Sequence, residues 1–120
     1  MSVTPLPRLR TPLCELLGVD YPIIQTGMGW VAGPKLVSAS ANAGIMGILA
    51  SATMDFDQLK TSIAEVKTRT TKPFGVNLRA DSADVQDRIS LMIDEGIKVA
   101  SFAQAPKPEL ISRLKDAGVV

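Results

Sequence analysis

Short apolar runs alternate with longer amphipathic segments along the chain of 120 residues. The apolar runs predict buried strands at 21–25, 46–50, 74–78 and 98–102, with Val119-Val120 beginning a fifth. Between them, apolar residues recur every three or four positions, which predicts helices over 34–43 and 55–69, from Ser82 to Gly96, and from Pro108 to Gly118. This order predicts an α/β fold made of repeated strand–helix units.

Residues at the predicted helix ends support these boundaries. Pro34 suits a first helical position, where its missing N–H has no helical partner to lose, and Gly44 suits the left-handed residue after a helix end. Asp55 and Gln58 have the spacing of a capping box at the start of the second helix.

A short internal repeat marks where each helix passes to the next strand. It reads Asn-Ala-Gly-Ile at 42–45, Asp-Glu-Gly-Ile at 94–97 and Asp-Ala-Gly-Val at 116–119. The predicted strand starts lie between 21 and 28 residues apart, close to the roughly 30 residues per unit of an eight-unit barrel. Four such units and a further strand amount to half a barrel.

Strict alternation of strand and helix requires a parallel sheet with right-handed crossovers, which leaves an open doubly wound sheet or a closed barrel. Spacing alone does not separate them. A half barrel would leave its first and last strands as unpaired edges, which argues that the native chain is longer. We expect a (β/α)8 TIM barrel, with residues 1–120 as the N-terminal half of a single domain.

Composition and charge exclude several functional classes. The chain is 46% hydrophobic and 21% charged, with a net charge of +1 spread along its length, so we expect no nucleic-acid partner. No apolar run approaches the roughly 20 residues of a membrane span, and the first ten residues do not resemble a signal peptide, so we expect a cytoplasmic protein that binds no membrane.

Cys14 is the single cysteine and the chain has no histidine. We therefore expect neither a disulfide framework nor a metal site, and no histidine-activated nucleophile within these residues. Cys14 itself is expected to be a half-buried small apolar residue.

Ligands bind at the carboxyl ends of the strands in both candidate folds, and two sequences there are distinctive. Gly27-Met28-Gly29 lets the backbone approach a flat ligand and offers main-chain N–H groups to it, although a tight turn would also need glycine. Asn77 is a polar residue in an otherwise apolar strand, so its amide pairs either with neighbouring backbone or with a bound ligand.

Three further residues follow strands or the glycine loop. Ser51 and Gln104 are weaker candidates, because polar residues are common where loops begin. Trp30, the only tryptophan, either walls a ligand pocket or packs between helix and loop.

Residues 27–32 also satisfy the dinucleotide pattern G-x-G-x-x-G/A, which makes a Rossmann-like or flavodoxin-like nucleotide-binding module without enzymatic activity the rival interpretation. Asp55 would then be the acidic ribose partner. Against this, Pro34 places the helix start after the motif, whereas the fingerprint needs its third small residue inside the helix.

Several of these segments together resemble the nitronate monooxygenase (2-nitropropane dioxygenase) family. The resemblance rests on Tyr-Pro-Ile-Ile-Gln at 21–25, the Met28-Gly29 pair, Ala-Asn-Ala-Gly at 41–44 and Lys-Pro-Phe-Gly-Val-Asn-Leu at 72–78. It implies an FMN-dependent (β/α)8 barrel oxidoreductase. By this resemblance Gly27, Met28 and Gly29 line the flavin ring through their backbone, and Asn77 contacts the cofactor from the third strand.

The family includes nitronate monooxygenases and flavin-dependent reductases of enoyl thioesters and CoA esters. Where its common pattern is Gln-Ala-Pro-Met-Ala-Gly, this chain has Gln-Thr-Gly-Met-Gly-Trp at 25–30, which puts a bulky residue near the ring. This version is most similar to an actinobacterial subgroup that reduces a CoA thioester during steroid-ring breakdown. It implies a small-molecule substrate and NAD(P)H-dependent reduction of a CoA thioester, with oxidation of alkyl nitronates by O2 as the alternative. The family's catalytic histidine would lie beyond residue 120, so we assign no catalytic residue.

Overall fold

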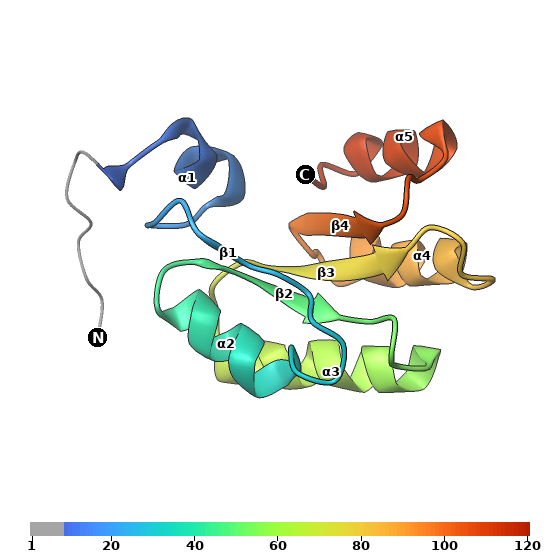
Figure 1. The fold of residues 1–120 in the computed structure, drawn as a ribbon, viewed down its shortest axis with the longest axis horizontal. Coiled ribbons are helices and arrows are strands. Elements are labelled where there is room, and N and C mark those ends of the chain that lie inside the picture. Colours follow the sequence, from blue (N-terminus) through green and yellow to red (C-terminus); the bar gives the residue numbers. More distant parts are fainter. Residues whose placement is uncertain (1–8) are drawn as a thin grey trace.

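A parallel four-stranded sheet organises the computed structural model, which describes residues 9–120 (Figure 1). Its strands are β1 (Ile24–Gln25), β2 (Met46–Ala50), β3 (Phe74–Arg79) and β4 (Val99–Ala103). The helices are α1 (Pro12–Leu17), α2 (Pro34–Asn42), α3 (Phe56–Arg69), α4 (Val85–Asp94) and α5 (Pro108–Asp116). From β1 onward, strand and helix alternate as the sequence predicted.

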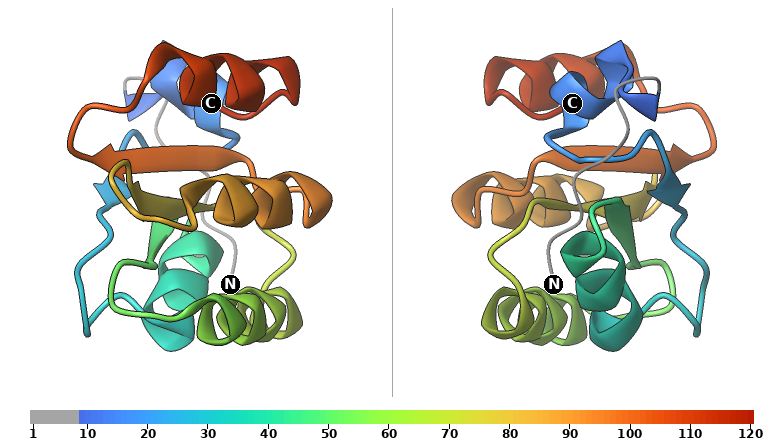
Figure 2. Two further views of the ribbon diagram at one scale, coloured as in Figure 1. Left: turned by 90° about the vertical axis from the view of Figure 1, so that its right-hand side faces the viewer. Right: turned by 90° about the vertical axis from the view of Figure 1, so that its left-hand side faces the viewer.

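The strands are adjacent in the order β1-β2-β3-β4, each paired in parallel with its sequence neighbour. In Rossmann-like and flavodoxin-like sheets, by contrast, the order reverses at a switch point. The Rossmann-like or flavodoxin-like alternative is therefore wrong. Figure 2 shows the sheet curving, with α2 to α5 around its convex side, as in the first four units of a (β/α)8 barrel.

The start of a fifth strand is visible beside β4. Val120 donates its backbone N–H to the Lys98 carbonyl at 3.0 Å and accepts from the Ala100 N–H at 2.9 Å. These two bonds to residues on either side of Val99 have the slanted pattern of a parallel pair. Val120 therefore pairs with β4 as the start of a fifth strand would, as predicted from the sequence.

Two apolar clusters lie on opposite faces of the sheet. The larger one fills the space between the strands and α2 to α5 and includes Leu49, Val76, Leu78, Ile63 and Met92. The smaller one lies on the concave face and includes Leu17, Val19, Met46, Ile48 and Val99. Because α1 supplies Leu17 where the strands begin (Figure 1), it closes the amino-terminal end of the half barrel.

The residues predicted to begin and to end helices do so in the structure. Asp55 caps α3 through a capping box, accepting from the Gln58 N–H while Gln58 Oε1 accepts from the Asp55 N–H, both at 2.8 Å. The three glycines of the internal repeat, Gly44, Gly96 and Gly118, all adopt positive φ. After each, the next N–H bonds back across the last helical turn, at 2.9 Å from Ile97 to Met92.

Three local predictions need correction, and one helix was missed. The first strand is only Ile24–Gln25, because Tyr21 to Ile23 form a tight turn closed by a 2.8 Å bond between these two residues. Helix α4 begins at Val85 rather than Ser82, whose carbonyl accepts the Val85 N–H in a turn before the helix. Helix α1 was not predicted. Cys14, within it, is fully buried rather than half-buried.

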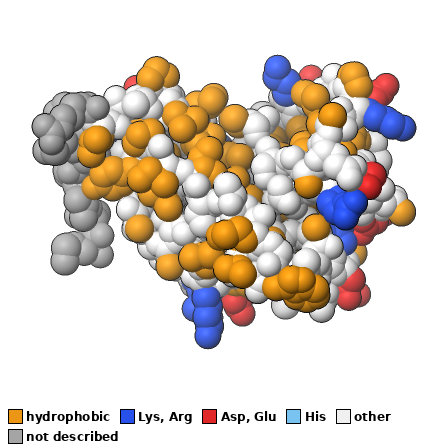
Figure 3. Space-filling view, in the orientation of Figure 1, with side chains coloured by type: hydrophobic (Ala, Val, Ile, Leu, Met, Phe, Trp, Pro, Cys, Tyr) orange, Lys and Arg blue, Asp and Glu red, His pale blue; other side chains and the backbone are white. Residues whose placement is uncertain are grey.

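Large apolar side chains remain exposed on α1, on β1 and the residue before it, and in the loop after β1. They are Leu16, Ile23, Ile24, Met28, Trp30 and Val31. Figure 3, drawn in the orientation of Figure 1, shows hydrophobic groups gathered over these elements. Among residues 9–120, no helix is long and apolar enough to cross a membrane.

Candidate functional site

The carboxyl ends of the central strands bring polar side chains together. Ala50, Asn77 and Ser101 are register partners across β2, β3 and β4. Since Val76 and Leu78 belong to the helix-side cluster, the alternation of a strand turns Asn77 toward the concave face. There its Nδ2 donates to Ser101 Oγ at 2.8 Å.

Gly27 lies against the Asn77 side chain. A β-carbon placed on Gly27 would be 2.5 Å from Asn77 Cβ and 3.1 Å from its Cγ. The sequence predicted both residues as parts of one site, and the structure brings them into contact. The contact also explains the glycine, because no larger residue fits this position without moving the strand.

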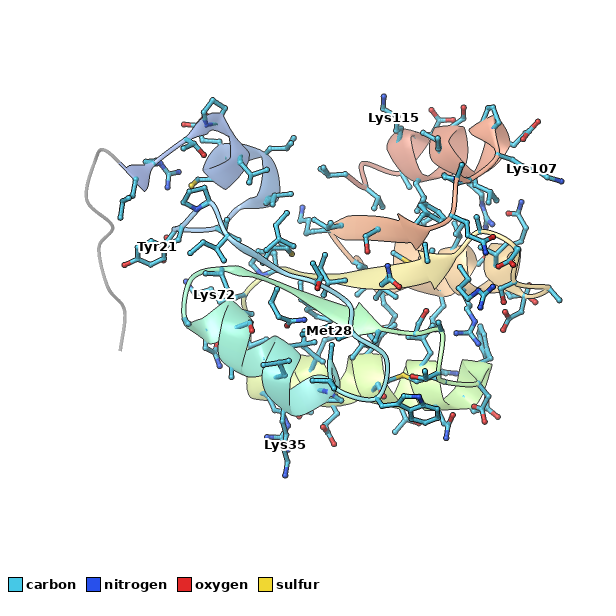
Figure 4. The ribbon with its side chains drawn as sticks, in the orientation of Figure 1. Tyr21, Met28, Lys35, Lys72, Lys107 and Lys115 are labelled. Carbon is cyan, nitrogen blue, oxygen red and sulfur yellow. The ribbon has the colours of Figure 1, made fainter. Side chains whose placement is uncertain are left out.

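The β1–α2 loop, residues 26–33, leaves three consecutive backbone donors without an acceptor within residues 9–120. Among the described residues, the N–H groups of Gly27, Met28 and Gly29 donate to no acceptor, whereas the Met28 carbonyl accepts from Val31 and Ala32. The Met28 side chain is half-exposed above the sheet, and Tyr21 and Lys72 lie toward the opposite end (Figure 4). Unpaired consecutive N–H groups of this kind can bind an anion or an electron-rich ring edge.

Gln25, which the sequence analysis used only as part of a motif, fastens this loop to the sheet. Its Nε2 donates to the Ile48 carbonyl at 3.1 Å and to the Thr26 carbonyl at 2.5 Å. The two carbonyls fix the orientation of the amide, and Oε1 is left buried with no partner among the described residues. A buried acceptor without a donor is costly, so this atom is placed to accept a hydrogen bond from a ligand.

The β2–α3 loop, residues 51–54, supports Asn77 from the other side. Ser51 is buried, and both its Oγ, at 2.5 Å, and its N–H, at 3.3 Å, donate to the Asn77 carbonyl. The loop also reaches the glycine segment, because a β-carbon on Gly29 would be 3.1 Å from Thr53 Cγ2. Ser51, only a weak candidate from sequence, thus has a defined structural contact.

Arg88, on α4, was missed entirely. It is 8% exposed and donates to the carbonyls of Ser51 and Met54 and to the Asp84 carboxylate. The pKa of Asp84 is lowered, first by a hydrogen bond from Ser82 Oγ and then by the hydrogen bond from the Arg88 guanidinium. The signal in the sequence was its position, since Arg88 falls on the buried stripe of α4 between Val85 and Met92.

Trp30 neither packs between helix and loop nor is buried. Its indole is 88% exposed and its φ of 67° is unusual for a bulky residue. It lines a cleft of about 530 Å³ together with Ala32, Ala50, Met54 and the first turns of α3. The cleft has no lysine or arginine among its lining residues, which include Asp55 and Asp57.

Gln104 lies at an exposed loop position with a φ of 70°. It contacts Asp81, which forms an exposed ion pair with Arg79 at 2.9 Å. The hydrogen bond from Arg79 is the main cause of the lowered pKa of Asp81, and the same bond raises the pKa of Arg79. Gln104 is therefore not brought next to Asn77 by any described contact.

The site's donor set fits a flat, electron-rich group better than a metal. In the part of the chain that the structure describes, no cluster of three or more histidine, cysteine or acidic residues is placed to hold a metal ion. The unpaired N–H groups over Asn77, together with the unpaired Gln25 oxygen, offer both donors and an acceptor, as the edge of a flavin ring requires.

Comparisons with known proteins agree with this geometry. The chain is 66% identical over 113 residues to the Mycobacterium tuberculosis protein named (3aS,4S,5R,7aS)-5-hydroxy-7a-methyl-1-oxo-octahydro-1H-indene-4-carboxyl-CoA dehydrogenase, covering 94% of this chain and 32% of that protein. It is 39% identical over 87 residues to a nitronate monooxygenase of Paraburkholderia phytofirmans, covering 68% of this chain and 24% of that one. The chain thus spans about a third or less of the relatives it matches.

A solved structure and a family model extend the agreement to nearly the whole chain. FabK from Thermotoga maritima superposes with a TM-score of 0.87 at 35% identity, covering 92% of this chain and 35% of that one. The likeness to this barrel confirms the predicted fold class. The family model described as nitronate monooxygenase matches residues 10–120. The chain belongs to the nitronate monooxygenase family.

Proposed function

We propose that this chain is part of an FMN-dependent oxidoreductase that acts on a CoA thioester, with NAD(P)H as the second redox partner. The observation that carries the proposal is the run of unpaired N–H groups at Gly27, Met28 and Gly29 over Asn77, at the carboxyl ends of the strands. In barrel enzymes the reaction takes place at this end.

The residues around Asn77 have complementary tasks in this proposal. The backbone N–H groups of Gly27 to Gly29 would bind one edge of the flavin, and Asn77, held by Ser101, would bind from below. Flavin supplies hydride-transfer chemistry, and hydrogen-bond donors near its ring favour the electron-rich reduced form. Gln25 would orient the loop through the Ile48 and Thr26 carbonyls and offer Oε1 to a donor.

The substrate class is supported by the relatives. The protein that is 66% identical is named as a dehydrogenase of a bicyclic CoA ester, whereas the nitronate monooxygenase is 39% identical. The exposed Trp30 lines a cleft of about 530 Å³ that Asp55 and Asp57 also line, and its indole offers an aromatic surface to an apolar acyl group. The name of the first relative favours substrate oxidation, whereas we expected reduction, so the direction must be measured.

Oxidation of alkyl nitronates by O2 is the second candidate. It is favoured by the family model and by the relative of that name. The two candidates share the cofactor and the loop geometry, and they differ in the compound that exchanges electrons with the flavin.

Residues 1–120 would supply half of the barrel. At one edge of the sheet, Ile24 of β1 and Ile23 just before it are exposed, at 42% and 54%. At the other edge, Val120 pairs with β4. In a closed barrel both edges pair with further strands, which would cover these side chains.

The cytoplasmic location stays a prediction.

The first experiment asks whether the complete protein holds flavin. We expect purified protein to be yellow and to release FMN on denaturation. Protein that stays colourless and shows no flavin absorbance after reconstitution with FMN would contradict the proposal.

The second experiment separates the two candidate substrates. The flavin is mixed anaerobically with NADH, with a hydroxyacyl-CoA ester, and with a nitroalkane anion, and its visible absorbance is followed. Bleaching by NADH or by the CoA ester, with none by the nitronate, supports the CoA-thioester reaction. Bleaching by the nitronate alone would replace it with nitronate oxidation.

A further inference from the structure

We propose that Arg88 is a positioning residue for the flavin site: it holds the β2–α3 loop and itself contacts neither Asn77 nor the glycine segment, residues 27–29. This inference rests on the proposed function, because the site it positions is the proposed flavin site. Its basis is a chain of hydrogen bonds that joins α4 to Asn77.

The first link is the burial of the arginine. Its side chain is 9% exposed, and a charge that deep is destabilising unless its N–H groups are paired. All three guanidinium nitrogens are used: Nη1 donates to the Ser51 carbonyl at 2.6 Å, Nη2 to the Met54 carbonyl at 2.7 Å, and Nε to Asp84 Oδ2 at 2.8 Å. The planar group thereby holds both ends of the residue 51–54 loop.

The second link runs from that loop into the site. Ser51 donates through Oγ and N–H to the Asn77 carbonyl, and Asn77 in turn donates from its side chain to Ser101. Only one residue, Ser51, therefore stands between the guanidinium and Asn77.

A second route leads to the glycine segment. Thr53, in the middle of the clamped loop, lies against Gly29, while Gly27 lies against Asn77. Both sides of the proposed site thus rest on one loop whose position Arg88 sets. A small displacement of the loop would move the Asn77 amide and the N–H groups of residues 27–29 relative to one another.

Lysine cannot replace this arginine. A single ammonium group cannot span two carbonyls and a carboxylate in the fixed fork that the guanidinium provides. Arg88→Lys therefore keeps the charge and removes the geometry, which makes it the informative variant.

Arg113 provides a matched control. It also joins two elements, donating from α5 to the Gln86 carbonyl at 2.9 Å, to Gln86 Oε1 at 2.7 Å and to Ser90 Oγ on α4. None of its partners belongs to the β2–α3 loop, to Asn77 or to the glycine segment. Arg113→Lys thus tests the loss of an arginine cross-link without disturbing the site.

The experiment measures the affinity of the complete apoprotein for FMN by quenching of flavin fluorescence, beside Tm and backbone hydrogen exchange at residues 51–54. We expect Arg88→Lys to weaken FMN binding by about tenfold and to speed exchange in the loop. Arg113→Lys should leave FMN affinity within about twofold of the parent even if its Tm falls equally. Ser51→Ala, which breaks the next link, should weaken FMN binding in the same direction, and it replaces Arg88→Lys if that variant does not fold.

Three results are distinguishable. Parent protein that binds no FMN would overturn the proposed function itself. Parent protein that binds FMN, together with folded Arg88→Lys and Ser51→Ala proteins whose FMN affinity and flavin spectrum are unchanged, would overturn only the role of Arg88. An equal loss of affinity in Arg113→Lys would also overturn it, because the effect would then follow general destabilisation.

Discussion

The β1–α2 loop and the β2–α3 loop form two sides of the candidate site, and they are held in opposite ways. The first is exposed from Met28 to Val31 and leaves the N–H groups of residues 27–29 unpaired. The second is fixed at Ser51 and Met54 by a buried guanidinium and continues into the capping box of α3. The contrast suggests that one loop keeps its donors for a ligand while the other supplies the rigid support beneath it.

The largest expected effect comes from removing that support. Arg88→Met would leave the Met54 carbonyl without a donor, the Ser51 carbonyl with only the Met54 N–H, and Asp84 without its cation. We expect a loss of about 2–3 kcal/mol in the free energy of unfolding, below the usual cost for a fully buried pair because Asp84 is partly exposed. Denaturant unfolding of the complete protein measures it, and an unchanged midpoint would show that water replaces the guanidinium.

The next effect tests the contact between the two sides. Gly27→Ala would place a β-carbon 2.5 Å from Asn77 Cβ, so strand or loop must move, at a cost of about 1–3 kcal/mol. We also expect weaker FMN binding. Gly33→Ala is the control, because a β-carbon there meets nothing within 4 Å and the residue's φ is −91°. Equal losses in both variants would mean that the Gly27 contact is not tight in solution.

A smaller effect is expected at the far end of the β2–α3 loop. Asp55→Ala removes the side-chain acceptor of the α3 capping box, which should reduce stability by about 1 kcal/mol. Because the Ser51 and Met54 contacts remain, FMN affinity should stay close to that of the parent. Thermal unfolding and FMN titration together check this, and a large loss of FMN affinity would show that the loop is less rigid than we infer.

The smallest effect is pH-dependent. The pKa of Asp84 is lowered below its ordinary value of 3.8, so its ionised form stabilises the fold at neutral pH and this contribution is lost as the pH falls through the lowered pKa. In Asp84→Asn, the free energy of unfolding should therefore fall less steeply below about pH 4. The difference from the parent should be less than about 1 kcal/mol, because the Asp84 side chain is partly exposed. Asp81→Asn is the control, because its pair with Arg79 is fully exposed and screened. Denaturant unfolding of the parent, Asp84→Asn and Asp81→Asn proteins is measured across acid pH. Identical pH profiles of stability for the three proteins would contradict the role given to Asp84.

Much of the fold was predictable because local signals coincided with tertiary structure. Pro34 starts α2, Asp55 caps α3, and the repeated glycines end three helices as expected. Helix α1 was overlooked although Pro12 and Gly18 mark its ends. The start of α4 was misplaced because Ser82 has the chemistry of a cap, while its hydroxyl is bonded to Asp84 Oδ1 instead.

The candidate site was predictable in part. The loop glycines and Asn77 could be named because glycine and a polar residue in a buried strand are conspicuous in a sequence. Their role toward a flavin stays a prediction. Arg88 could not be found in the same way, because a charged residue in a helix is ordinarily on the solvent side. Its partners are backbone carbonyls, which every residue possesses, so no sequence pattern identifies them.

The sequential order of the strands has a consequence for how the molecule folds. Each strand pairs with the one made just before it, from β1 through β4 to Val120. Pairings of this kind close loops of only one helix and its turns, so the entropy lost at each step is small and similar. A nascent chain could therefore add one strand–helix unit at a time as it leaves the ribosome, with each finished edge acting as the template for the next.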